Sequence, residues 1–187
     1  MRAYAGGDAA AFETLYDRHA ARVWRYILRS TGDAATADDL AQEVWFSVAR
    51  QAGQYAPRAS APGLPLARFA TWLFTLARHR VIDHLRARRP QASLDAPVGE
   101  GDATLADTLA APSGFGPLRR IETRQQAAQL LAALAELPPE QREAFLLQAE
   151  AEMRVSDIAV ATGVGFETAK RRLRYARAAL RRALENL

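Results

Sequence analysis

The sequence predicts an all-α fold of two small helical domains joined by a flexible linker. Apolar residues recur at three- and four-residue intervals in both halves of the chain, no strand pattern appears, and a segment rich in proline and glycine separates the halves. We expect the first domain at residues 1–90, the linker at 91–118 and the second domain at 119–187. A loop of that length would be unusual inside one compact domain, which favours a domain boundary there.

The first domain is predicted to be a bundle of three or four helices. Asp8 can cap a helix that ends near Gly32, a second helix covers about 34–51, and a long helix covers about 66–89, where Pro90 stops it. Three prolines and a glycine between residues 55 and 65 predict a loop before the long helix.

The second domain is predicted to contain a helix-turn-helix. Helices are expected near 121–135, 139–149, 155–162 and 166–184. Ala159 is small where two helices must cross, Gly163 can adopt the positive φ that reverses the chain, and Val164 can fill the angle between the helices. This spacing is typical of a DNA-binding helix-turn-helix.

The last helix has a narrow apolar stripe and a broad basic face. Ala169, Leu173, Ala176 and Leu180 share the stripe, whereas seven basic residues and one acid lie between 165 and 182. A solvated face on an ordinary helix is the alternative, but insertion into the major groove fits the turn better. The predicted duplex-binding residues are Phe166, Glu167, Thr168, Lys170, Arg171, Arg172, Arg174, Tyr175 and Arg177.

The long helix of the first domain carries a tryptophan on its polar side. Trp72, His79 and Arg86 are seven residues apart, about two helical turns, so they follow one line along the helix. An indole beside basic groups can support an unstacked base while phosphates are held nearby. The alternative is a tryptophan that packs under the preceding loop.

Composition and charge exclude several classes of protein. The net charge is +4, the pI is about 9.9, and there are no cysteines, so neither disulfides nor thiolate metal sites can form. Residues 90–118 contain four acids and no arginine or lysine, which predicts an acidic linker between two basic domains. No apolar run approaches the ~20 residues that span a bilayer, and we expect a cytoplasmic protein with no membrane insertion.

Catalytic chemistry is not indicated by any motif. No acid–base pair, phosphate-binding loop or metal-ligand spacing is apparent, and His79 and His84 do not share a helix face. We therefore predict no enzyme activity, no cofactor and no small-molecule substrate.

Three stretches give the chain a family resemblance. Residues 39–45, DLAQEVW, are similar to a DLxQExF motif, residues 69–86 are similar to FxxWLxxIARNxxIDxLR, and residues 137–145 begin a fourth-region pattern that the helix-turn-helix completes. In this order, on either side of a linker, they resemble the extracytoplasmic-function (ECF) branch of the sigma-70 family of bacterial RNA polymerase sigma factors. That branch retains only the second and fourth sigma regions.

The resemblance implies a function and a set of partners. Sigma factors bind core RNA polymerase and direct it to promoter DNA, where region 4 recognises the −35 element and region 2 recognises the −10 element and stabilises the melted strand. An anti-sigma factor is an expected further partner. The implied polymerase-binding residues are Asp39, Leu40, Gln42, Glu43 and Trp45. The implied residues for the melted strand are Trp72, Arg78, His79, Arg80 and Arg86.

Some residues depart from the family pattern. His79 stands where the family often has asparagine, Arg154 stands where serine or threonine usually caps a helix, and Arg171 replaces a common serine. These differences bear on promoter preference. The alternative function is a one-component transcriptional regulator with an N-terminal sensing domain, which predicts an apolar pocket within residues 1–89 and a dimer on palindromic DNA.

Overall fold

The structure is a computed structural model that describes residues 1–56, 68–88 and 124–185. Every regular element in these ranges is helical, which confirms the all-α fold. The N-terminal elements are α1 (Arg2–Ala5), α2 (Ala9–Thr31), α3 (Ala34–Arg50), the 3-10 turn η1 (Ala52–Gln54) and α4 (Phe69–Arg88). The C-terminal elements are α6 (Arg124–Ala135), α7 (Pro139–Ala151), α8 (Val155–Thr162) and α9 (Phe166–Glu185).

The ends of the first helices follow from local chemistry, and the cap at Asp8 and the end at Gly32 were predicted. The Asp8 carboxylate accepts a hydrogen bond from the Ala11 N–H at 3.2 Å, which caps α2. Gly32 ends the same helix with a φ of +77°. Asp33 then caps α3 by accepting from the Thr36 N–H at 2.7 Å, and its hydrogen bonds with Thr36 lower the pKa of the Asp33 carboxyl.

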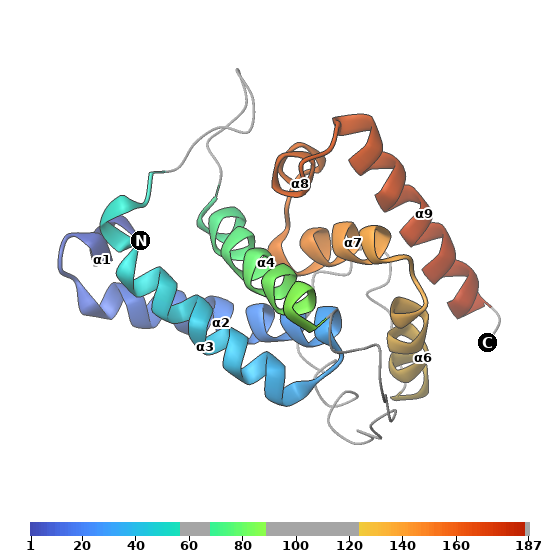
Figure 1. Cartoon of the computed structure of the whole chain (residues 1–187), viewed down its shortest axis with the longest axis horizontal. Helices are drawn as coiled ribbons and strands as arrows, with labels where there is room; N and C mark the ends of the chain where they lie inside the picture. The colour runs from blue at the N-terminus through green and yellow to red at the C-terminus, as the bar shows by residue number, and fades with distance from the viewer. Residues whose placement is uncertain (57–67, 89–123, 186–187) are drawn as a thin grey trace.

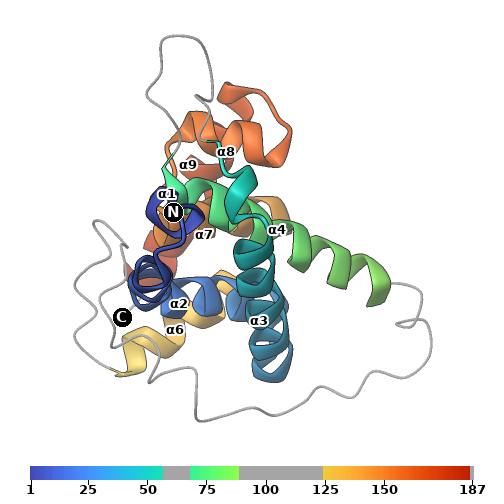
Figure 2. The same cartoon turned by 90° about the vertical axis from the view of Figure 1, so that its left-hand side faces the viewer.

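Helices α2, α3 and α4 form the N-terminal bundle (Figure 1). Tyr26, Val44 and Leu73 are among the side chains that meet in its buried centre. Figure 2 shows the C-terminal turns of α4 projecting beyond α3 into solvent. The bundle therefore leaves the end of its long basic helix accessible.

The helix-turn-helix is present as predicted. Gly163 has a φ of +69° between α8 and α9, and the Val164 N–H donates to the Ala159 carbonyl at 3.0 Å across the turn. At the start of α8, the Asp157 carboxylate accepts from the Arg154 guanidinium at 2.9 and 3.0 Å and from the Arg154 backbone N–H at 3.3 Å. The Asp157 carboxylate thus satisfies one backbone donor at the start of α8, whereas Arg154, whose guanidinium has no acceptor, provides no side-chain cap there.

The C-terminal helices have a core of their own. Leu130 of α6, Phe145 of α7 and Leu180 of α9 are buried together there. Ala169, Leu173, Ala176 and Leu180 are all buried, as the predicted apolar stripe of α9 requires. The opposite face of α9 is thereby directed to solvent.

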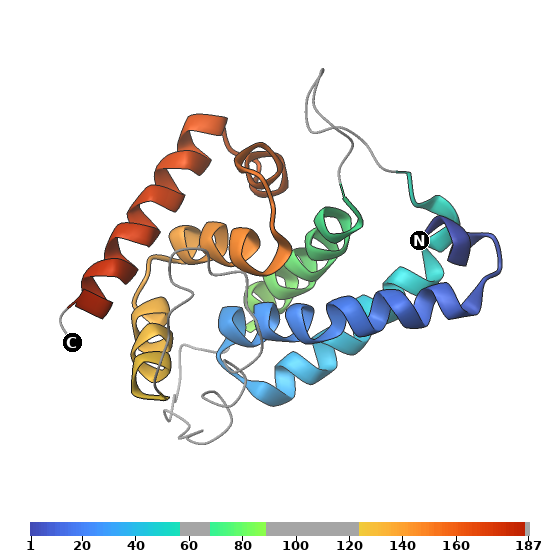
Figure 3. The ribbon, with the colours of Figure 1, turned by 180° about the vertical axis from the view of Figure 1, so that it is seen from behind.

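A single buried cluster also joins the two predicted domains. Leu146 and Leu147 of α7 are fully buried in the same cluster as Tyr26 and Phe74 of the N-terminal bundle. Figure 3 shows α7 beside the C-terminal half of α2. The domain limits at 90 and 119 remain predictions, and the predicted linker 91–118 lies outside the described residues.

Burial along α4 depends on where other helices cover it. Phe74 is fully buried, whereas Leu85 of the same helix is exposed. Helix α4 packs against α2 and α3 on one side and against α7 on another, so two of its faces are covered. Phe74 and Leu85 are eleven residues, about three turns, apart and share a face, and Leu85 is exposed because it belongs to the C-terminal turns that project beyond the bundle (Figure 2).

Candidate nucleic-acid and protein interfaces

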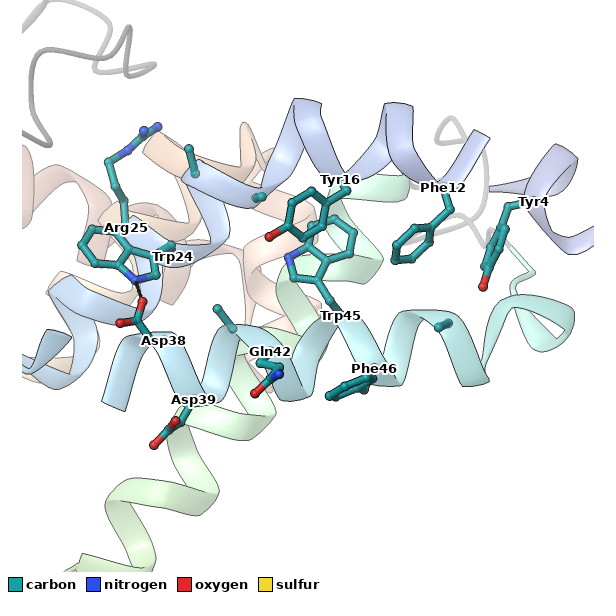
Figure 4. Close-up of a pocket in the computed structure, with 14 residues that line it drawn as sticks. Tyr4, Phe12, Tyr16, Trp24, Arg25, Asp38, Asp39, Gln42, Trp45 and Phe46 are labelled. Carbon is teal, nitrogen blue, oxygen red and sulfur yellow. Dashed lines mark hydrogen bonds between the residues drawn. The ribbon is translucent and has the colours of Figure 1, made fainter. Parts of the chain in front are cut away.

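A groove of about 980 Å³ runs between α2 and α3 (Figure 4). Tyr16 packs against Trp45 along it with ring centroids 4.9 Å apart, and Asp38 accepts a hydrogen bond from the Trp24 indole N–H at 2.7 Å. The aromatic lining is Tyr4, Phe12, Tyr16, Trp24, Trp45 and Phe46, and the polar lining is Arg25, Asp38, Asp39 and Gln42. An apolar surface with an acidic edge suits a basic amphipathic partner.

The residues implied for polymerase binding form an exposed group and a buried group on α3. Asp39, Gln42 and Glu43 are exposed on the outer face of α3, where a protein partner can reach them. Leu40 and Trp45 are each only 7% exposed and belong to the bundle core. The buried pair therefore supports the exposed face from beneath.

Phe46 is a site residue that the sequence analysis missed. Its side chain is 58% exposed and lines the groove on the same helix as Asp39 and Gln42 (Figure 4). The signal was present in the spacing, because Phe46 is out of phase with the buried positions Val44 and Val48. An exposed phenylalanine one turn after Gln42 gives this face an apolar contact point.

Trp72 lies half-buried in an aromatic cluster at the start of α4. Its ring centroid is 5.2 Å from that of Tyr55 and 5.7 Å from that of Phe69. His19 of α2 packs behind Phe69 at 5.6 Å, and burial, with the charges of Arg22 and Arg18, lowers its pKa to about 4. The Trp72 indole thus has a rigid aromatic backing and a remaining accessible part.

The basic residues of α4 that were implied for strand binding differ in exposure and in their side-chain partners. His79 and Arg86 are exposed, whereas Arg80 donates to the Ser47 hydroxyl at 3.1 Å and pairs with Glu43 at 3.6 Å. The Arg78 side chain is 15% exposed and its Nε donates to Glu143 of α7 at 2.8 Å. Of these four groups, His79 and Arg86 face solvent, whereas Arg78 and Arg80 are held by other side chains of the protein.

Helix α9 presents the predicted duplex-binding face. Phe166 is 51% exposed at its N-terminus, Thr168 and Arg172 are half-buried, and the other predicted residues of this helix are exposed. Glu167 and Lys170 are 3.8 Å apart, and the Arg174 guanidinium lies 5.2 Å from the Tyr175 ring centroid. A shallow hollow of about 320 Å³ lined by Glu167, Thr168, Lys170, Arg171 and Arg174 marks the same face.

Neither a metal-ligand cluster nor a membrane-spanning helix is found within the described ranges. No group of three or more histidine, aspartate or glutamate side chains there could hold a metal ion. In those ranges there is also no helix that is both long and apolar enough to cross a membrane.

Two family matches define the class of protein. Residues 15–91 match Sigma-70 region 2, and residues 127–180 match Sigma-70, region 4. The ECF RNA polymerase sigma factor SigL of Mycobacterium tuberculosis is 34% identical over 183 residues, covering 98% of this chain and 94% of SigL. RNA polymerase sigma factor CarQ of Myxococcus xanthus is 33% identical, covering 100% of this chain and 97% of CarQ. The chain belongs to the ECF branch of the sigma-70 family.

Solved structures have the same fold. The sigma factor RpoE of Bartonella quintana, in complex with the anti-sigma factor NepR, is similar with a TM-score of 0.68 and 20% identity, covering 94% of this chain and 97% of RpoE. CnrH, in complex with the cytosolic domain of CnrY, is similar with a TM-score of 0.60 and 22% identity, covering 97% of this chain and 92% of CnrH.

The family assignment also decides between the two predicted functions. The groove between α2 and α3 is an apolar hollow within residues 1–89, which the regulator alternative had predicted. The sigma-70 matches cover both helical halves, however, and the groove is bordered by the α3 residues implied for polymerase binding. The chain is a sigma factor.

Proposed function

We propose that this sigma factor directs promoter-specific initiation through three separate surfaces. The outer face of α3 docks on core RNA polymerase, the start and polar side of α4 bind the melted strand, and α9 binds the upstream duplex. None of these roles needs a catalytic residue, so the factor acts by binding alone. Its site of action is the cytoplasm, where polymerase and promoter DNA are found.

Polymerase docking is supported by the chemistry of the α3 face. Asp39 and Glu43 supply negative charge, Gln42 supplies an amide, and Phe46 supplies an exposed apolar contact. A basic helical partner with apolar side chains complements such a surface. Leu40 and Trp45 hold α3 in place from the core.

Capture of the melted strand is supported by the aromatic cluster of α4. The accessible part of Trp72 can stack on an unpaired base, with Tyr55 and Phe69 fixing its orientation. His79 and Arg86 are free to approach phosphates, and Arg78 and Arg80 can join them after releasing Glu143 and Glu43.

Duplex binding is supported by the exposed N-terminal half of α9. Phe166, Glu167 and Arg171 are exposed and meet base edges in the major groove in this proposal, and the exposed Arg174 and Arg177 meet phosphates. The buried alanine and leucine stripe of the same helix anchors it to α7 and α8. The basic face on an anchored helix-turn-helix is the single observation that most supports DNA recognition.

An anti-sigma protein is proposed as a further partner. RpoE and CnrH, which share this fold, were solved in complexes with NepR and with the cytosolic domain of CnrY. A protein inhibitor of this chain would compete most simply for the groove between α2 and α3, where apolar surface is exposed.

A pull-down with core RNA polymerase tests the docking surface. We expect the wild-type chain to bind core, and Asp39→Arg to reduce binding at least about tenfold, because it places a like charge against a basic partner. Glu13→Arg is the matched control, since Glu13 is an exposed acid of α2 that does not line the groove. Failure of the wild-type chain to bind core in the absence of other proteins would overturn the proposed function.

A further inference from the structure

The aromatic cluster at the start of α4 has an arginine at its edge that the sequence analysis did not assign to DNA. Arg68 directly precedes the helix, and its side chain is 76% exposed. Its carbonyl accepts a hydrogen bond from the Trp72 N–H at 3.4 Å, so the two residues are one helical turn apart and lie on one side of the helix. Arg68 therefore brings a cation to the cluster of Tyr55, Phe69 and Trp72.

A second unassigned arginine, Arg2, approaches the same cluster from α1. Helix α1 packs against α2 and against η1, the turn that directly precedes Tyr55 (Figure 1). Burial raises the pKa of the Tyr55 hydroxyl, and the charge of Arg2 opposes that shift, as a guanidinium close to the ring would. Tyr55 in turn lies 5.2 Å from Trp72. Arg2 and Arg68 thus surround the same indole, although α1 and α4 are far apart in the sequence.

The cations already assigned to strand binding lie further from Trp72. At 1.5 Å of rise per residue, His79 is about 10 Å and Arg86 about 21 Å along α4 from Trp72, whereas Arg68 is only about 6 Å away. The phosphates of a stacked base lie within one nucleotide of its ring, a span that Arg68 covers and Arg86 does not. A base on the Trp72 indole therefore needs a cation on the N-terminal side of α4.

The acid nearest to Arg68 holds it only weakly. The Arg68 guanidinium lies 3.6 Å from Glu152, whose side chain is 54% exposed, and Glu152 also lies 3.2 Å from Arg22. An ion pair between two exposed side chains at this distance contributes little. A phosphate can accept two parallel hydrogen bonds from one guanidinium, so it is the stronger partner. Arg68 is thus available to a nucleic acid.

We propose that Arg2 and Arg68 form a phosphate clamp, which holds the backbone of the melted strand while its base rests on the Trp72 indole. The proposal rests on the proposed function and adds two residues to its strand-binding surface. The aromatic cluster binds the face of the base, and the two guanidiniums neutralise the charge of the backbone. Neither arginine reads the base, because every nucleotide carries the same phosphate. The clamp fixes where the strand lies, and other residues determine the sequence preference.

The salt dependence of strand binding counts the phosphates that the clamp holds. Holoenzyme with the full-length chain is titrated, by fluorescence anisotropy, with a labelled single strand copied from the bubble of a promoter that it transcribes. Each phosphate contact on single-stranded DNA contributes about 0.7 to the slope of log affinity against log salt concentration. The double variant Arg2→Ala and Arg68→Ala should therefore lower the slope by about 1.4, twice 0.7, and weaken binding at low salt at least about fivefold.

Two further variants separate a phosphate contact from a general effect of charge or folding. Arg68→Lys keeps the cation and should keep the slope, whereas Arg68→Ala alone should lower it by about 0.7. Arg181→Ala removes an exposed arginine from the end of α9 that is far from α1, and it should leave the slope unchanged (Figure 1). Helix content and core binding should be the same in all variants. An unchanged slope in the double variant, or an equal fall in Arg181→Ala, would overturn the clamp.

Neutral linkages locate the clamp on the strand. A methylphosphonate has no charge, so one placed at each position of the strand in turn removes one phosphate contact at a time. Wild-type holoenzyme should lose affinity at the linkage beside the base that Trp72 captures, and the double variant should not. That base is the one whose removal as an abasic site weakens the wild-type complex but not the Trp72→Ala complex.

The same experiment distinguishes the clamp from the function on which it rests. Identical methylphosphonate patterns for the wild-type chain and the double variant, with the effect of Trp72→Ala intact, would contradict the clamp alone. Wild-type holoenzyme that binds the strand no better than core polymerase does would contradict the proposed function, and the clamp with it.

Discussion

Trp72 is the residue on which the strand-binding surface depends. Because the indole is half-buried against Tyr55 and Phe69, Trp72→Ala removes the stacking surface and part of a local cluster while α3 stays intact. We expect core binding to be unchanged and open-complex formation on a duplex promoter to fall by about tenfold or more, since a stacked base contributes about 1–3 kcal/mol. Permanganate footprinting of the bubble measures this.

A pre-melted template provides the control for Trp72→Ala. If the indole acts by capturing an unpaired base, a template with an artificial bubble should restore most of the activity of the variant. Trp72→Phe should retain an intermediate level, because it keeps an aromatic face. Equal defects on duplex and pre-melted templates would show that the substitution damages the fold instead.

His19 predicts how stability depends on pH. Its pKa is lowered to about 4 by burial and then by the charges of Arg22 and Arg18, so the folded state keeps it neutral while the unfolded state takes up a proton near pH 6.5. The free energy of unfolding should therefore fall as the pH drops from about 6.5 to about 4. Between pH 7 and pH 5 the loss from this group is about 1–2 kcal/mol.

Urea unfolding of His19→Gln at the two pH values checks that assignment. The variant should lose less stability than the wild-type chain between pH 7 and pH 5, because it cannot take up the proton. An identical loss in both proteins would mean that other groups account for the acid sensitivity.

At the scale of elements, Gly163 sets the angle of the helix-turn-helix. A Cβ at this position meets no atom within 4 Å, so Gly163→Ala costs only the backbone energy of a φ of +69°, about 1 kcal/mol. Chemical denaturation should show that loss. Gly53→Ala, at an open position without a positive φ, should change stability much less.

The exposed arginines of α9 should contact DNA in two ways: Arg171 through a base edge and Arg174 through a phosphate. Arg171→Ala should relax sequence preference at one upstream position by about 1–3 kcal/mol, as expected of a base contact. Arg174→Ala should weaken binding to all sequences and lower the salt dependence by about one phosphate contact. Fluorescence anisotropy of the holoenzyme on promoter variants, at several salt concentrations, distinguishes the two, and the same behaviour in both variants would contradict the assignment.

Helix ends and the helix-turn-helix could be predicted because their causes are local. Asp8 and Gly163 act on residues within one turn of themselves, and the structure has both as predicted. The exposure of Leu85 could not be predicted from the amphipathic pattern of α4, because it depends on how far the neighbouring helices extend along that helix.

At the scale of the whole molecule, the pairing of α2 with α7 was beyond the reach of sequence patterns. Arg25 and Glu150 pair at 3.0 Å but are 125 residues apart, and in the sequence both resemble ordinary surface charges. Nothing in the periodicity of α7 distinguishes Glu150 from an exposed acid, since its burial depends on the other half of the chain. The sequence thus predicted two groups of helices but did not predict the contact between them.

The shared core predicts how the whole molecule unfolds. Since Leu146 and Leu147 are buried in one cluster with Tyr26 and Phe74, the wild-type chain should unfold in a single calorimetric transition. Glu150→Gln should show two transitions, because its halves no longer stabilise one another. Two transitions already in the wild-type chain would mean that the halves are energetically independent.

Run-off transcription from a library of promoter sequences tests the central claim most directly. Core RNA polymerase should produce transcripts from a restricted set of promoters only when this chain is added, and that set should share two conserved elements, upstream and at the start of the bubble. Transcription that is unchanged by the chain, with core of verified activity, would contradict its assignment as a promoter-specificity factor.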